Sequence, residues 1–295
     1  MTGYRTDLAM ESTGGARGSS QGVSVEQHRR GESEITWVRI KSPQAAYQLG
    51  KPQGAYWTLW HPHLPRLSPE ERMPVAREIA RVLRHMLPEQ GDVLVLGLGN
   101  RRMTADALGD RVVSGVLVTR HLRDEQLRGV CALAPGVLGI TGVETAELAT
   151  GLVERLHPAA VVVVDALAAM ETSHICTTVQ LTDTGIQPGS GVGNHRAALC
   201  EETLHVPVVA LGIPMVVYAS TIVRDALKKI LSRESTEEAA EAMAAELSGG
   251  AVSEMVVTPR DIDEVVAGLA DMLALAINAA LQPRCSMEEL SHYLH

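Results

Sequence analysis

The chain has 295 residues, enough for one large domain or two small ones, and 45% of them are hydrophobic. Its formal net charge of -9 argues against a nucleic-acid-binding protein that relies on a broad basic surface. We expect no membrane span, because there is no run of about 18 apolar residues. We also expect no secretory signal, because the N-terminus carries early charges and no apolar segment. The four cysteines lack CxxC spacing and are expected to be free thiols in a reducing compartment.

The first 34 residues are rich in Gly, Ser, Arg and Glu and show no apolar periodicity. Such a segment cannot bury enough apolar surface to fold alone, so the composition predicts a mobile tail over residues 1–34. The compact fold is expected to begin near Ile35 and to form a single domain over residues 35–295.

Capping signals predict three helices. Ser68 and Glu71 form a capping box ahead of a segment with one apolar face. Ser235 and Glu238 repeat this signal later in the chain. Thr258, which a proline follows, is expected to open the third helix.

Three short and continuous apolar runs predict strands that are buried on both faces, at residues 93–96, 160–164 and 206–211. Helical stretches lie between them, so the order is strand, helix, strand, repeated. We therefore expect a three-layer α/β/α domain with a mostly parallel sheet. Ligands in such folds bind beyond the carboxyl ends of the strands, so the residues that follow each run are the first candidates for a site.

The first predicted strand is followed by the residues Gly-Leu-Gly-Asn, which end at Asn100. Glycines there allow a tight turn and a close approach of the backbone to a ligand. Arg102 stands where a dinucleotide-binding motif needs its third glycine, which argues against such a cofactor. Asp106 follows at the start of a predicted helix, where the ordinary structural interpretation is a capping or first-turn acid.

The second predicted strand leads directly into Asp165 after four valines. A carboxylate in this place is costly to bury unless it has a partner or a purpose, and an arginine partner is the structural alternative. If Asp106 and Asp165 share a pocket, their repulsion keeps one protonated and leaves the other as a base. Such a pair can activate water and protonate the group being cleaved, which is enough to hydrolyse an amide. The spacing alone leaves their separation open.

A glycine-rich stretch over residues 182–194 is the third feature. Its glycines rule out regular structure through most of its length, so it is either a flexible surface loop or a loop that folds over a site. Its Asp-Thr-Gly triplet imitates a pepsin motif, but a single copy in an α/β chain is interpreted as coincidence. The supporting site residues expected here are Asp183, Gly185, Gly189, Ser190, Gly191, Gly193 and Asn194.

Taken together, these motifs resemble the germination protease of spore-forming bacteria. The likeness runs from about residue 92 to 222 and resumes at 256–259, so it covers more than half of the chain. The blocks that carry it are 97–100 (GLGN), 104–109 (TADALG), 117–122 (LVTRHL), 134–142 (APGVLGITG), 164–169 (VDALAA), 183–194 (DTGIQPGSGVGN), 206–214 (VPVVALGIP) and 256–259 (VVTP).

The resemblance implies an endopeptidase, made as a zymogen, that degrades small acid-soluble spore proteins in the spore cytoplasm during germination. It also implies a homotetramer, a fold like that of the hydrogenase-maturation endopeptidases, and no cofactor, metal, nucleic-acid or membrane partner. The two acids thought to act in the family fall on Asp106 and Asp165. Asn100 and His121 lie in matching blocks and are expected to support them.

The N-terminus also resembles a processing site of the family, in which an acid precedes a bulky apolar residue and an alanine. The sequence Arg-Thr-Asp-Leu-Ala-Met-Glu ends at Glu11. We expect self-cleavage between Asp7 and Leu8, which makes residues 1–7 a short propeptide. A substrate-like segment in the same chain reaches a catalytic site at high effective concentration.

Two alternatives remain open. Ala105 stands where the family usually has proline, and Tyr218 where an acid is common, so the chain is alternatively an inactive relative that binds spore proteins without cutting them. The other alternative is a metal-assisted peptidase in which Asp106, Asp165 and His121 hold a divalent ion.

Overall fold

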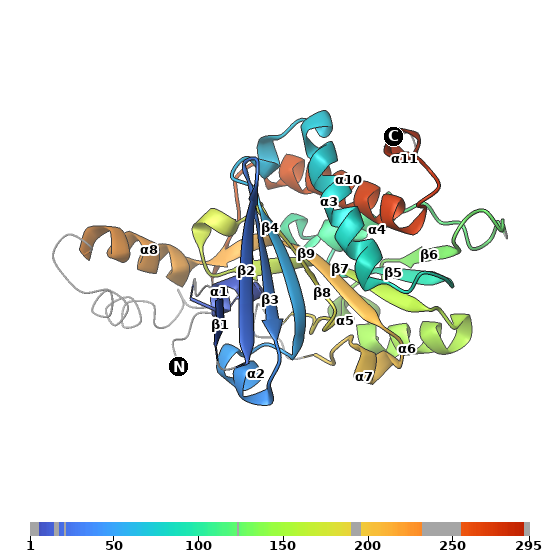
Figure 1. Cartoon of the computed structure of the whole chain (residues 1–295), viewed down its shortest axis with the longest axis horizontal. Coiled ribbons are helices and arrows are strands. Elements are labelled where there is room, and N and C mark those ends of the chain that lie inside the picture. Colours follow the sequence, from blue (N-terminus) through green and yellow to red (C-terminus); the bar gives the residue numbers. More distant parts are fainter. Residues whose placement is uncertain are drawn as a thin grey trace.

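The computed structural model describes residues 6–14, 18–20, 22–122, 124–189, 196–231 and 255–291. Within these residues one mixed sheet runs in the order β1-β2-β3-β4-β8-β9-β7-β5-β6, with β10 beside β9 (Figure 1). The strands are β1 (Gly18–Ser20), β2 (Val23–Arg30), β3 (Ser33–Ile40), β4 (Gly54–Trp60), β5 (Val93–Gly97), β6 (Val130–Leu133), β7 (Ala160–Ala169), β8 (Thr178–Thr182), β9 (Val208–Tyr218) and β10 (Val256–Val257).

The three predicted strands form the centre of the parallel half of the sheet. They correspond to β5, the first part of β7, and β9, and both β5–β7 and β7–β9 are parallel pairs. The α/β fold class is therefore confirmed. The other half, from β8 to β1, is antiparallel. Strands β2 and β3 of this half lack long continuous apolar runs, because many of their side chains are at least partly exposed.

The first 34 residues differ from the predicted mobile tail wherever the structure describes them. Strand β2 pairs with β3 from Val23 opposite Ile40 to Arg30 opposite Ser33, so the boundary expected near Ile35 lies inside a hairpin. Most side chains of β2 are polar and at least partly exposed, which leaves too weak an apolar pattern for a strand to be predicted.

Helices cover both faces of the parallel half (Figure 1). The described helices are α1 (Ala9–Ser12), α2 (Pro43–Leu49), α3 (Pro69–Met86), α4 (Leu108–Ser114), α5 (Leu138–Thr141), α6 (Thr145–Leu156), α7 (Glu201–Leu204), α8 (Ala219–Leu231), α10 (Ile262–Leu281) and α11 (Met287–Ser291). Val93 and Val95 of β5 pack in the same core cluster as α3, α4 and α10. The alternate residues, Leu94 and Leu96, pack with α6 and α7. This period of two produces the expected three layers.

The helix starts match the capping signals only in part. Ser68 Oγ accepts the N–H of Glu71 at 3.3 Å, and Glu71 Oε2 accepts the N–H of Ser68 at 2.8 Å, so this capping box is confirmed. The third helix, α10, begins at Ile262 instead of just after Thr258. Thr258 does not cap this helix. Its hydroxyl instead donates to the carbonyl oxygen of Met215 at 2.9 Å. The helix predicted after Ser235 lies outside the described residues.

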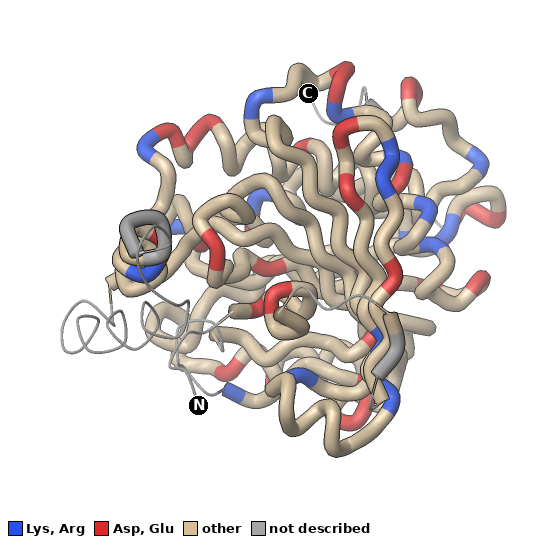
Figure 2. The backbone as a smooth tube through the Cα atoms, turned by 60° about the vertical axis from the view of Figure 1, so that its left-hand side comes forward, with Lys and Arg blue, Asp and Glu red and all other residues tan. Residues whose placement is uncertain are grey.

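Helix α10 is long and apolar enough to cross a membrane by composition, with a mean hydropathy of 1.7 over its best window, although no such span was expected. However, 78% of that window is buried inside the fold, where α10 packs against α3 and α4. It is the central helix of the core in this structure. In the view of Figure 2, Lys and Arg are interspersed with Asp and Glu along the described backbone.

Candidate active site

Asp165 lies inside β7, because this strand continues to Ala169 beyond the end predicted from the four valines. The neighbouring strand β5 stops opposite Val164, and its chain leaves the sheet at that level. On the other side Asp165 pairs with Gly212 of β9. The carboxyl group is therefore positioned at the carboxyl end of β5, and the residue is only 7% exposed.

Asp106 reaches the same edge of the sheet through the loop that follows β5. It ends a 3-10 helix, η2 (Thr104–Asp106), and its Oδ2 accepts the N–H of Asn100 at 2.9 Å. The loop folds tightly because Gly99 has a φ of 105°, and a Cβ there would lie 1.9 Å from the carbonyl oxygen of Asp106. The cap residue of α4 is Ala107, so Asp106 does not cap that helix.

Both aspartates line one cavity of about 230 Å³, which we call the aspartate cavity. Its wall also includes Asp7, Gly189 and Arg196. The spacing in the sequence did not establish whether Asp106 and Asp165 lie close together. The fold brings them into one cavity because β5 and β7 are adjacent parallel strands.

The environment of Asp165 favours its protonated form. Burial raises the pKa of this carboxyl well above its ordinary value, and the charges of Asp106 and Asp7 raise it further. The N–H of Ala166, 2.9 Å from Asp165 Oδ1, and the charge of Arg196 act in the opposite direction and more weakly.

The pKa of Asp106 departs less from its ordinary value. Burial raises its pKa, while the N–H of Asn100 and the charge of Arg196 oppose the change. Asp165 is the more deeply buried of the two and therefore keeps its proton to the higher pH. The cavity thus combines a carboxyl group that favours its proton with one that loses it more readily, the arrangement a general acid and a general base require.

Residues 6–9 lie beside this cavity, along β7. The N–H of Asp7 donates to the carbonyl oxygen of Ala168 at 2.9 Å, and the N–H of Ala168 donates to Asp7 Oδ2 at 2.8 Å. Leu8 is fully buried in an apolar pocket with Leu167 and Val217. The segment expected to be a mobile propeptide and cleavage site is therefore docked from Thr6 onward.

Two polar side chains from the antiparallel half hold the same segment. Lys51 Nζ donates to the carbonyl oxygen of Thr6 at 2.7 Å. Gln180 Nε2 donates to the carbonyl oxygen of Asp7 at 3.0 Å, and Gln180 Oε1 accepts the N–H of Ala9 at 2.8 Å. The sequence offered no motif for either residue, because each stands alone in its segment.

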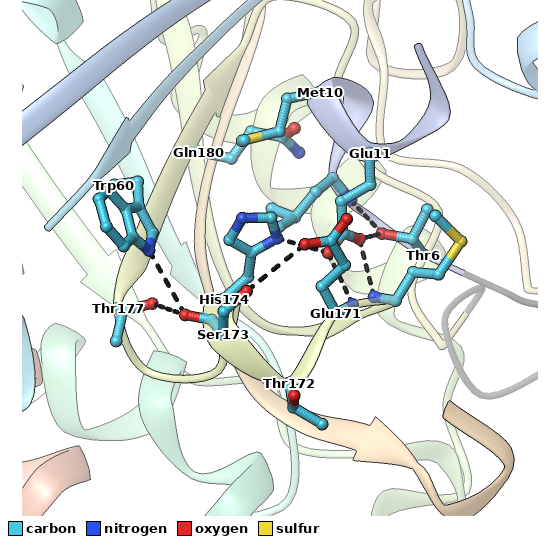
Figure 3. A network of polar contacts seen from close by, with 12 residues as sticks. Thr6, Met10, Glu11, Trp60, Glu171, Thr172, Ser173, His174, Thr177 and Gln180 are labelled. Carbon is cyan, nitrogen blue, oxygen red and sulfur yellow. Dashed lines mark hydrogen bonds and ion pairs between the residues drawn. The ribbon is translucent and has the colours of Figure 1, made fainter. Parts of the chain in front are cut away.

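Glu11 holds the carboxyl-terminal end of this segment in place (Figure 3). Its carboxylate accepts the N–H groups of Met170 and Glu171 at 2.7 and 2.9 Å, and it contacts His174 Nδ1 at 2.7 Å. It also accepts the hydroxyl of Thr6. We call Glu11 with these four partners the Glu11 anchor.

The other site residues expected from the glycine-rich stretch fall into three groups. Asp183 and Gly185 line a neighbouring cavity of about 780 Å³, where Asp183 Oδ1 accepts the N–H of Ala55 at 2.8 Å. Gly189 lies in the aspartate cavity itself. Ser190, Gly191, Gly193 and Asn194 lie outside the described residues.

His121 is exposed and does not line the aspartate cavity, so it is not a third ligand beside the two aspartates. Among the described residues no group of three His, Cys, Asp or Glu side chains is arranged to hold a metal ion. Ala105 lines the aspartate cavity, whereas Tyr218 is a buried residue at the end of β9 and is not part of that wall. Arg196 also lines this cavity, and its charge opposes the rise that burial causes in the pKa of both aspartates, but no signal in the sequence pointed to it.

Germination proteases match this chain over nearly its whole length. A sequence model of the family described as germination protease matches residues 6–253. The chain is 39% identical to the germination protease of Caldanaerobacter subterraneus subsp. tengcongensis over 99% of this chain and 98% of that protein. It is 33% identical to the germination protease of Bacillus cereus over 99% of this chain and 97% of that protein. A solved NiFe hydrogenase maturation protease, HycI from Thermococcus kodakarensis, is 17% identical, covers 66% of this chain and 98% of its own, and has a TM-score of 0.34. The chain belongs to the germination protease family.

Proposed function

We propose that this protein is an endopeptidase that begins the degradation of small acid-soluble spore proteins in the spore cytoplasm during germination. It cuts peptide bonds with Asp106, Asp165 and a water molecule, works as a homotetramer, and removes its own residues 1–7. The observation that carries the proposal is the aspartate cavity, in which an acid–base pair lies beside a docked segment with an acidic residue followed by leucine and alanine.

The unequal environments assign the chemical roles. Asp106 takes a proton from the water while the water oxygen bonds to the carbonyl carbon, and Asp165 gives its proton to the carbonyl oxygen. The C–N bond of the tetrahedral intermediate then breaks as Asp106 passes its proton to the leaving nitrogen. Asp165 recovers a proton from a hydroxyl of the intermediate, so both groups return to their first state.

The docked segment supplies the substrate for self-processing. Asp7 is the residue before the bond that is cut, and Leu8 is the residue after it. The fully buried Leu8 and the hydrogen bonds of Asp7 to Ala168 support this assignment, because a peptide held at both residues has little freedom left to lose.

The test compares wild type with Asp106→Asn and Asp165→Asn. Mass spectrometry of mildly acidified protein should show the loss of residues 1–7 in wild type alone, and only wild type should cut a peptide that contains Thr-Glu-Ile-Ala. Asp110→Asn, on the adjacent helix α4 and outside the aspartate cavity, is the control and should behave as wild type.

Normal turnover by both cavity variants would overturn the mechanism. A wild-type protein that binds the peptide but never cuts it would instead identify the chain as an inactive relative. Loss of activity in a strong chelator would favour a metal-assisted reaction.

A further inference from the structure

Gln180 is a buried side chain whose two polar ends both bind the docked segment. It is 5% exposed, its Nε2 donates to the carbonyl oxygen of Asp7 at 3.0 Å, and its Oε1 accepts the N–H of Ala9 at 2.8 Å. These two bonds flank Leu8, so the amide spans the peptide from the residue before the proposed cut to the second residue after it.

The sheet places Gln180 in one row with Asp165. Gln180 of β8 and Asp165 of β7 both pair with Gly212 of β9. Residues paired in this way project from the same face of a sheet, so the two side chains rise on either side of a residue that has none. A Cβ at Gly212 would lie 2.6 Å from Leu167 Cγ and 2.7 Å from the carbonyl oxygen of Asp165, so this position has no room for a side chain.

We propose that Gln180 binds the carbonyl group that is attacked, both in self-processing and in separate protein substrates, and so is a substrate-binding residue of the reaction. This inference rests on the proposed function, because the attacked carbonyl is that of Asp7 only if the Asp7–Leu8 bond is the one cut. The carbonyl oxygen has two lone pairs, so it accepts the Gln180 amide and still receives the proton of Asp165.

The chemistry gives this contact its value. Attack by water moves negative charge onto the carbonyl oxygen, and a donor already aimed at that oxygen binds the transition state more strongly than the ground state. The bond from Ala9 to Oε1 sets the register of the peptide. An amide supplies a donor and an acceptor side by side without needing to bind a proton, which explains why glutamine suits this position near neutral pH.

The first test is Gln180→Met, which removes the donor and the acceptor at nearly constant volume. We expect kcat/KM for a peptide containing Thr-Glu-Ile-Ala to fall by roughly 100-fold or more, with the loss mainly in kcat, and self-cleavage to slow to a similar degree. Gln27→Met on β2, where no described group bonds Gln27 Oε1, is the matched control and should keep wild-type rates.

A second variant guards against a folding defect. Gln180→Glu has the same shape, but its carboxylate has no donor until it is protonated. Its rate relative to wild type at the same pH should therefore be low near neutrality and recover as pH falls, which a purely structural role of Gln180 does not predict.

The outcomes separate the two proposals. If wild type cuts and Gln180→Met cuts equally fast, the role of Gln180 is refuted while the peptidase proposal stands. A Gln180→Glu to wild-type rate ratio that does not change with pH also refutes it. If wild type cuts nothing, the proposed function itself fails.

Discussion

Replacing Glu11 with alanine should release the docked N-terminal segment. The carboxylate accepts two backbone N–H groups, from Met170 and Glu171 at 2.7 and 2.9 Å, besides its contacts with His174 and Thr6. A hydrogen bond to a charged group contributes about 1.5 kcal/mol or more, so the two N–H bonds alone stabilise the docked state by about 3 kcal/mol. The docking equilibrium should weaken by roughly 100-fold, because 1.4 kcal/mol corresponds to about a factor of ten.

Hydrogen exchange reads this change directly. The amide of Asp7 donates to Ala168 and that of Ala9 to Gln180, so both are protected only while the segment is docked. In Glu11→Ala their exchange should accelerate by roughly 100-fold if local opening limits it.

Glu26→Ala removes an exposed carboxylate that lies 3.7 Å from Arg39, a contribution of roughly 0–1 kcal/mol, and should leave these amides protected. If Glu11→Ala changes their exchange no more than this control does, the Glu11 anchor does not hold the segment.

Three further predictions concern titration and packing. The pKa of Asp165 is raised in the folded protein, so folding stability is lost as pH rises from the unfolded-state pKa, about 4, towards the folded-state pKa. Asp165→Asn should therefore resist urea better than wild type at neutral pH but not at acid pH. Burial lowers the pKa of His174, but the hydrogen bond and charge of Glu11, with the charges of Glu171 and Glu34, raise it overall. The docked segment should then be held best below about pH 6.5 and loosen as pH rises through the raised value, and exchange at Ala9 should lose this dependence in His174→Gln. Gly212→Ala should cost about 1–3 kcal/mol in urea unfolding, because its Cβ meets Leu167 and Asp165, whereas Gly139→Ala, with open space around it, should not destabilise the protein.

The parallel half of the fold was predictable because each of its central strands contains a continuous apolar run. These strands are buried on both faces, as such runs indicate. The residues that follow such strands share one edge of the sheet, and this rule pointed to Asp106 and Asp165. The cavity they share follows from the adjacency of β5 and β7.

The contacts that hold the docked N-terminal segment were not predictable in this way. Lys51, Gln180 and Glu11 come from segments far apart in the chain, and each is an isolated polar residue without a spacing pattern. They come together only because the antiparallel half places β8 beside β9 and the N-terminal segment lies along β7. The prediction of a mobile tail was wrong at β2 for a related reason. A strand whose side chains are mostly polar and exposed has a composition like that of a disordered segment.

The position of the Glu11 anchor has a consequence for activation. Glu11 lies on the carboxyl side of the proposed cut, together with the fully buried Leu8. If the chain cuts itself between Asp7 and Leu8 as proposed, hydrolysis separates the first seven residues from the rest but leaves the new N-terminus held by the Glu11 anchor and by the buried Leu8. Cutting and opening would then be separate events, because access of another protein to the aspartate cavity would also require release of the Glu11 anchor.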